Sequence, residues 1–276
     1  MDHYQFIFNS INKESKEQLI ALLDNIGFEG FEEGEEMLTA FVAIDKFDEI
    51  EFGNIIATNS VSYSKSIIKE TNWNKEWEAG FEPVTIYHPV SGIPFVAVRA
   101  NFHLAVPGVL HDLVITPKMS FGTGHHATTY LMIREMSLLD CKNKTVIDFG
   151  TGTGVLAILA EKLGASKVIG IDIDDWSIDN AKENTAANGC VKIDILKGET
   201  ITAGINGDLI LANINLNIII GSLEVIRNAC NIDAVILFSG IMLQDRDHIL
   251  SVLAENQFHI NKVVTKDNWL AISTNL

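Results

Sequence analysis

The amino-acid sequence predicts an α/β protein with a doubly wound, mostly parallel sheet and a small amino-terminal α+β domain. From Thr145 onward, strand-like apolar runs alternate with helical patterns, which is typical of a parallel sheet covered by helices on both faces. A glycine-rich turn, V-I-D-F-G-T-G-T-G over residues 146–154, joins one such strand to the next helix. Only residues 265–268 separate the last two apolar runs, which favours an antiparallel hairpin and one reversed strand at the end of the sheet.

The first 69 residues have the pattern of a ferredoxin-like module. Strand, helix, two strands, helix and strand follow one another, and the second strand pair turns around Gly34-Glu35-Glu36. No nucleotide or metal motif lies in this region, so residues 1–69 are predicted to form a substrate-recognition domain. The expected elements cover residues 4–8, 16–26, 28–34, 37–44, 47–57 and 61–68.

Residues 70–80 are predicted to form a linker helix. Trp73 and Trp77 are four residues apart, which places both indoles on one helical face. That face either packs as an ordinary core stripe or contacts the domain that follows. Residues 81–276 are then predicted to form the catalytic domain, beginning with short strands interrupted by prolines and a helix over 126–139.

The rest of this domain is predicted as a regular alternation of strands and helices. Each apolar run is short enough for a buried strand, and each intervening segment is long enough for a crossover helix. The predicted strands cover residues 145–149, 167–173, 191–196, 208–212, 234–239, 258–264 and 269–273, and the helices end near residues 163, 188, 230 and 255.

The composition limits the partners. A formal net charge of −16, with no run of Lys or Arg, disfavours direct binding to DNA and to anionic membranes and favours a basic protein partner. The acidic cluster at residues 32–36 is either a solvated turn or a surface for such a partner. No apolar run is long enough to span a bilayer, and the first residues lack a secretory pattern. We expect a cytoplasmic monomer.

The glycine-rich turn predicts a nucleoside cofactor, and charge indicates which one. Glycines at 150, 152 and 154 are compatible with nicotinamide, flavin or S-adenosylmethionine (SAM) proteins, or with a structural turn. Asp148 beside the loop would repel a pyrophosphate, but it can support the ammonium of a methionine moiety. Asp172, at the end of the next apolar run, can accept hydrogen bonds from ribose hydroxyls. These charges favour SAM.

Four motifs together resemble those of the ribosomal protein L11 methyltransferases, the PrmA family. They are F-G-T-G-H-H-A-T-T over 121–129, the glycine-rich turn, G-I-D-I-D over 170–174 and D-L-I-L-A-N-I over 208–214. The linker N-W-N-K-E-W and the amino-terminal module fit as well, so the resemblance covers nearly the whole chain. Two departures are Asp175-Trp176, where the family has a proline after the second acid, and Asn215-Leu216, where it has Leu-Ala.

The resemblance implies that Thr129, Gly150, Asp172 and Asn213 contact SAM, with Asp148, Gly152 and Gly154 completing the cofactor loop. It also implies a Rossmann-like SAM-methyltransferase sheet. Asn213 is the candidate catalytic residue, because its amide both donates and accepts and can orient an incoming amine. Helix or strand capping is the alternative role for Asn213 and for Thr128 and Thr129. His125 and His126 have no Cys, Asp or Glu partners at metal-ligand spacing, so no metal is predicted.

The function implied is SAM-dependent methylation of lysine amines, and of a terminal amine, on a large-subunit ribosomal protein. Such an enzyme holds the amine in line with the methyl–sulfur bond rather than generating a strong catalyst. Methylation of another protein or of a small molecule is an alternative. A nicotinamide oxidoreductase is disfavoured by the glycine spacing, and a DNA or glutamine methyltransferase by the absence of Asn-Pro-Pro-Tyr after residue 212. A non-catalytic interaction protein would bind SAM too weakly to matter.

Overall fold

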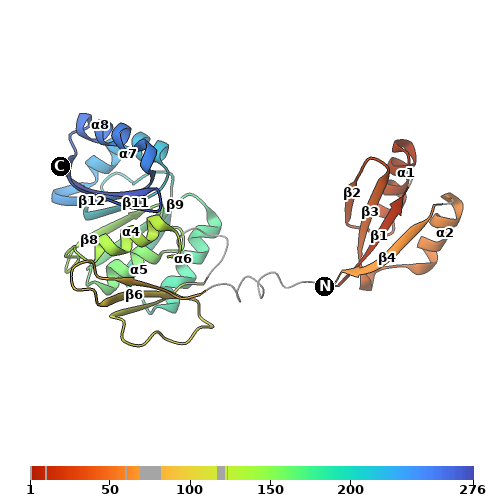
Figure 1. The fold of residues 1–276 in the computed structure, drawn as a ribbon, viewed down its shortest axis with the longest axis horizontal. Helices are drawn as coiled ribbons and strands as arrows, with labels where there is room; N and C mark the ends of the chain where they lie inside the picture. Colours follow the sequence, from red (N-terminus) through yellow and green to blue (C-terminus); the bar gives the residue numbers. More distant parts are fainter. Residues whose placement is uncertain (1, 10, 60, 69–81, 117–121, 123) are drawn as a thin grey trace. The chain divides into compact units, whose positions relative to one another are not determined.

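The computed structural model describes residues 2–9, 11–59, 61–68, 82–116, 122 and 124–276. The chain divides into two compact units, residues 1–78 and 79–276 (Figure 1). The predicted linker helix over 70–80, with Trp73 and Trp77, lies outside the described residues.

The amino-terminal unit is a four-stranded antiparallel sheet with two helices, in the order β2-β3-β1-β4. The central strand β1 is flanked by β3 and β4, so the first and last strands of the unit are neighbours, as in a ferredoxin-like fold. This confirms the element order predicted from the sequence. The elements are β1 His3–Asn9, α1 Lys13–Asp24, β2 Gly30–Glu33, β3 Met37–Ala43, α2 Glu49–Asn59 and β4 Tyr63–Ile68.

Alternation along the strands builds the core of this unit. Phe6 and Phe8 in β1 are fully buried and belong to one cluster with Leu19 and Leu23 of α1 and Phe52 of α2. The rings of Phe6 and Phe52 have centroids 4.4 Å apart. The two helices therefore cover the face of the sheet to which these side chains point.

The second unit is built on a seven-stranded sheet in the order β10-β9-β8-β11-β12-β14-β13. Its first five strands pair in parallel, and β14 pairs antiparallel with both of its neighbours. The strands are β8 Thr145–Phe149, β9 Lys167–Asp172, β10 Ile193–Lys197, β11 Gly207–Asn213, β12 Cys230–Met242, β13 His259–Lys266 and β14 Trp269–Asn275.

The single reversed strand predicted from the short final link is confirmed, but it is not the outermost strand. β14 lies between β12 and β13, so β13 forms the edge of the sheet. Residues Asp267 and Asn268, both with positive φ, make the tight turn that reverses the chain. β12 begins earlier and ends later than the predicted range 234–239, and it continues past Ser239 through an irregularity between Ser239 and Ile241.

Two apolar layers cover the two faces of the large sheet. Adjacent strand residues alternate between them: Val146 belongs to the layer under α4 and α5, and Ile147 to the layer under α7 and α8. This arrangement (Figure 1) is the doubly wound fold that the alternating elements predicted. The helices are α4 Ala127–Met136, α5 Val155–Lys162, α6 Asp175–Ala187, α7 Leu216–Asn228 and α8 Arg246–Glu255.

A three-stranded sheet precedes α4 and packs on the α4–α5 layer. It consists of β5 Val84–Tyr87, β6 Pro94–Arg99 and β7 His111–Val114, in the order β5-β6-β7. The Arg99 guanidinium bridges Asp112 and also donates to the His103 carbonyl oxygen, which fixes the connection between β6 and β7. Among the described residues, no helix is both long and apolar enough to span a membrane.

The structure predicts opposite effects for alanine at two glycines. Gly240 has φ +87°, and a Cβ there would lie 2.1 Å from the Ile214 carbonyl oxygen, whereas Gly221 in α7 has no atom within 4 Å of its Cβ position. Gly240→Ala should therefore lower the free energy of unfolding by about 2–4 kcal/mol. Gly221→Ala should raise it by about 0.5–1 kcal/mol. Calorimetric melting of both variants checks the pair, and an unchanged melting temperature in Gly240→Ala would contradict the packing described.

Candidate active site

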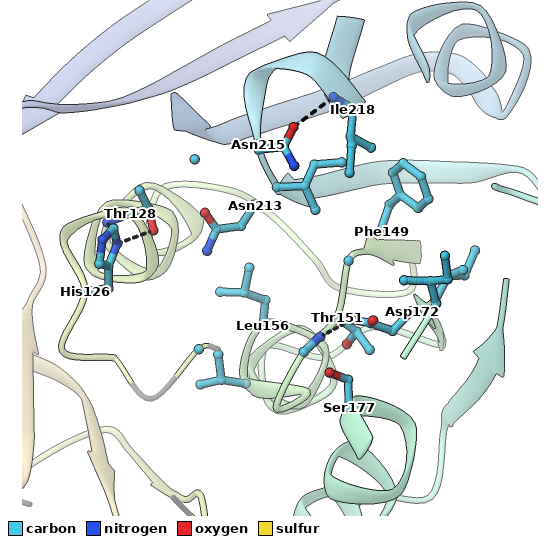
Figure 2. Close-up of a pocket in the computed structure, with 18 of the residues that line it drawn as sticks. His126, Thr128, Phe149, Thr151, Leu156, Asp172, Ser177, Asn213, Asn215 and Ile218 are labelled. Atoms are coloured by element: carbon cyan, nitrogen blue, oxygen red, sulfur yellow. Dashed lines mark hydrogen bonds between the residues drawn. The ribbon is translucent and has the colours of Figure 1, made fainter. Parts of the chain in front are cut away.

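The carboxyl ends of β8, β9 and β11 open onto a cavity of about 630 Å³. Ligands of open parallel sheets bind at this edge, and the volume lies within the usual range for small-molecule sites. Phe149 and Leu156 form part of its apolar wall (Figure 2). Ile171 also lines the cavity. The remaining lining residues are Gly122, His126, Thr128, Gly150, Thr151, Gly152, Val155, Asp172, Ile173, Ser177, Gly198, Glu199, Asn213, Ile214, Asn215, Ile218, Gly240 and Trp269.

The glycine-rich turn is held against the end of β9. The backbone amides of Gly150 and Thr151 both donate to the Ile171 carbonyl oxygen, at 2.8 and 2.9 Å. Gly150 has φ +80°, and a Cβ there would lie 2.1 Å from the Ile214 side chain, so glycine is required. Gly150 and Gly152 line the cavity, whereas Gly154 packs against Ala181 of α6 at the start of α5.

Asp172 ends β9 and lines the cavity beside this turn. Its Oδ2 accepts a hydrogen bond from the Gly152 amide at 2.8 Å, and its Oδ1 accepts one from the Asp174 amide at 3.2 Å. These two donors orient the carboxylate, which retains lone pairs for further donors. The arrangement suits a ligand that presents hydroxyl groups.

Asp148 lies behind the turn, fully buried, and does not line the cavity. One carboxylate oxygen accepts from the Thr151 hydroxyl at 2.7 Å and from the Ala157 amide at 3.1 Å. The other, Oδ1, has no hydrogen-bond partner among the described residues. Burial raises the pKa of Asp148 to about 7, although the two hydrogen bonds oppose this shift.

Asn213 ends β11 and reaches the cavity from the opposite side to Asp172 (Figure 2). Its Nδ2 lies 3.4 Å from the Thr129 hydroxyl oxygen, a long hydrogen bond, and its buried Oδ1 has no partner among the described residues. Thr129 itself is fully buried and is not part of the lining, whereas its neighbour Thr128 is. An unpartnered buried carbonyl oxygen is costly, so this atom is a candidate acceptor for a ligand.

His126 and Trp269 form the wall next to Thr128. His126 caps α4 by accepting from the Thr128 amide, and its Nδ1 lies 2.8 Å from the Thr128 hydroxyl. Its ring meets the Trp269 ring edge-on with centroids 4.8 Å apart, and burial lowers the pKa of His126. His125 is exposed and its Nε2 lies 2.9 Å from the Glu82 carbonyl oxygen. Within the described residues, no three His, Cys, Asp or Glu side chains are grouped so as to hold a metal ion.

Sequence reasoning missed several lining residues. Ile173 and Ile214 directly follow the two strand-end residues Asp172 and Asn213. Their position next to these residues is the sequence feature that could have predicted them as lining residues. Asn215 also lines the cavity and caps α7 by accepting from the Ile218 amide at 3.1 Å, which gives a physical role to one departure from the family pattern. Trp269 had no local signal, because β14 is brought there by the sheet order.

Comparisons with known proteins agree on one family. A family model described as ribosomal protein L11 methyltransferase (PrmA) matches residues 11–276. Two similar relatives, each named ribosomal protein L11 methyltransferase, come from Porphyromonas gingivalis (35% identity, covering 92% of this chain and 88% of the relative) and Chlorobaculum tepidum (35% identity, 98% and 95%). The crystal structure of a ribosomal protein L11 methylase from Lactobacillus delbrueckii subsp. bulgaricus superposes with a TM-score of 0.59 at 31% identity, covering 65% of this chain and 94% of that one.

The raised pKa of Asp148 predicts a pH-dependent stability difference. Because the folded-state pKa is about 7 and the usual value is 3.8, the folded protein keeps a proton that the unfolded chain releases. Stability from this group is therefore present at low pH and is lost as pH rises from about 4 to 7. Asp148→Asn removes this titration while keeping an acceptor for Thr151 and Ala157. Its melting temperature relative to the unsubstituted protein should rise across that range and stay level above pH 7, and a difference independent of pH would contradict the buried neutral carboxyl.

Proposed function

The chain belongs to the ribosomal protein L11 methyltransferase (PrmA) family and is a SAM-dependent methyltransferase of a ribosomal protein, and we propose that it methylates lysine side chains, and the terminal amine, of L11. The observation that supports this choice of acceptor is Asn213, which lines the cavity and whose buried carbonyl oxygen has no hydrogen-bond partner among the described residues. A neutral amine can donate to that oxygen while its lone pair points elsewhere.

The residues of the cavity fit SAM. Asp172 would accept from the ribose hydroxyls, and the turn at Gly150 and Gly152 allows the cofactor to approach the backbone closely. We propose that Asp148 and Gly154 support this turn without contacting the cofactor. Asp148 does so through its buried carboxyl, and Gly154 by packing on α6. Thr129 would act through its contact with Asn213, because its own side chain is buried.

Bound SAM supplies an electrophilic methyl group on a sulfonium, so the chain has to position the amine and exclude water. Phe149, Ile214 and Trp269 contribute apolar surface to the cavity, which lowers the local polarity. An ordinary lysine has a pKa of about 10.4 and is protonated at neutral pH. Desolvation among these side chains favours the neutral amine, and the Asn213 amide then orients it.

The amino-terminal unit is proposed to bind the substrate protein. Residues 1–68 contain 13 Asp or Glu and four Lys, so this unit has a large share of the net negative charge. Glu32, Glu33, Glu35 and Glu36 are all exposed around the turn between β2 and β3. The buried Lys16 of α1 donates to the carbonyl oxygens of Gly34 and Glu35, which anchors this acidic turn. An anchored, exposed cluster of carboxylates is suited to a basic protein surface.

Intact-mass analysis of purified L11 tests the proposed reaction. After incubation with the enzyme and SAM, L11 should gain mass in methyl-sized steps, and fragmentation should locate the methyl groups on lysine or on the terminal amine. Asp172→Ala should lose most of this activity, because the ribose hydroxyls lose their acceptor.

Asp179→Ala is the matched control, since Asp179 is an exposed acid on α6 that does not line the cavity. Its L11 methylation should be unchanged. SAM binding without any mass gain would be consistent with a methyltransferase but would reject L11 as its substrate. Methyl groups on other residue types would reject the assignment of lysine as the acceptor.

Charge reversal of the acidic turn tests the substrate-binding surface. Replacing Glu32, Glu33, Glu35 and Glu36 by Lys should raise the KM for L11 by about tenfold or more at low salt, with a smaller effect at high salt. The dissociation constant for SAM should not change, because these residues are not part of the cavity lining.

A variant of equal net charge separates the position of the charges from their number. Glu17, Asp24, Asp45 and Glu51 are exposed in the same unit but lie outside the acidic turn. Their replacement by Lys should raise the KM much less. An equal increase in both variants would mean that overall charge, and not the acidic turn, governs binding.

A further inference from the structure

Two asparagine side chains at the end of α6, Asn184 and the C-cap residue Asn188, bond the outer edge of β7 and the backbone that follows it, where the described residues place no strand. Asn188 Oδ1 accepts from the Val114 amide at 2.9 Å, and Asn188 Nδ2 donates to the Val114 carbonyl oxygen at 2.6 Å. One helical turn earlier, Asn184 Oδ1 accepts from the Thr116 amide at 2.9 Å. The two carboxamides thus reproduce the contacts of a neighbouring strand and fix the backbone that leaves β7.

Asn184 is also bonded to the glycine-rich turn. It is completely buried, and its Nδ2 donates to the Thr153 carbonyl oxygen at 2.9 Å. The Thr153 hydroxyl in turn donates to the Gly122 carbonyl oxygen at 2.8 Å. Because Thr153 and Gly122 are both buried, these bonds are shielded from water.

This chain of bonds ends at two parts of the cavity wall. Gly122 lines the cavity, and so does Gly152, whose amide binds Asp172 and whose neighbour is Thr153. The hydroxyl of Thr153 therefore joins Gly122 to the turn that orients Asp172. Thr153 does not line the cavity, so a direct contact with a ligand does not explain its hydroxyl group.

We propose that Thr153 is a positioning residue for the cofactor cavity: its hydroxyl fixes the Gly122 wall against the glycine-rich turn, and Asn184 fixes Thr153. Without the hydroxyl, the buried Gly122 carbonyl oxygen loses its donor and must turn toward water. Because Gly122 lines the cavity, a movement of this carbonyl group would change the cavity wall. The fixed wall thus keeps the cavity open for SAM before binding.

Calorimetric titration with SAM tests this proposal. Thr153→Val keeps the shape of the side chain and removes the hydroxyl, so its dissociation constant for SAM should increase by about tenfold. Thr153→Ser keeps the hydroxyl and loses only a methyl group, and it should bind SAM nearly as tightly as the unsubstituted protein. The pair Thr153→Ser and Thr153→Ala differs by the hydroxyl alone and gives the same comparison if the valine variant does not fold.

Thr185→Val is the matched control. The Thr185 hydroxyl donates to the Lys182 carbonyl oxygen at 2.8 Å within α6, and Thr185 is not part of the cavity lining. This variant should lose some thermal stability with no change in SAM affinity. If Thr153→Val behaves in the same way, with a lower melting temperature and unchanged affinity, the hydroxyl is only structural and the proposal is wrong. The measurement needs no protein substrate, so its outcome is separate from that of the L11 assignment.

Discussion

The hydrogen bond from the Gly152 amide to the Asp172 carboxylate is the interaction on which the rest of the site depends. It joins the turn after β8 to the end of β9, two strands that pair in parallel from Thr145 and Lys167 onward. The amides of Gly150 and Thr151 strengthen the junction by donating to Ile171. Because the turn is tied to the neighbouring strand, the cavity has one rigid side, and every other wall is positioned relative to it.

A feature of this structure can be predicted from the sequence when the residues that determine it are close together along the chain. Some features are encoded locally, by a few residues at a strand end: these are the glycine-rich turn, Asp172 and Asn213. The structure brings Gly150, Gly152, Asp172 and Asn213 to one cavity. The place of β14 between β12 and β13 is decided by the packing of the whole sheet, so neither that order nor Trp269 in the lining followed from local pattern. The same holds for Asn184 and Asn188. From the sequence, polar side chains on a helix are expected to be exposed to solvent. Only the tertiary fold shows that these two asparagines bond a strand edge in place of a neighbouring strand.

The two units of the chain differ in their charge. The amino-terminal unit concentrates carboxylates, and its acidic turn is anchored by the buried Lys16. Such a surface attracts a basic protein over a range of several ångströms set by ionic strength. The surface of the cavity in the second unit is mostly apolar. Such a surface excludes water, which suits the proposed methyl transfer to a neutral amine. Under the proposed function, recognition by charge and methyl transfer in an apolar cavity lie on separate folds.

The proposed amine acceptor accounts for the asparagine, rather than an acid, at the end of β11. An acid at residue 213 would pair with an incoming ammonium group and raise its pKa, which stabilises the form of lysine that cannot accept a methyl group. The Asn213 carbonyl oxygen accepts a hydrogen bond from a neutral amine without that electrostatic preference. Its orientation is maintained by Thr129 behind it, and Asp172 lies across the cavity, where a carboxylate suits hydroxyl donors (Figure 2). Under the proposed function, a neutral amide therefore faces the amine and an acid faces the ribose hydroxyls.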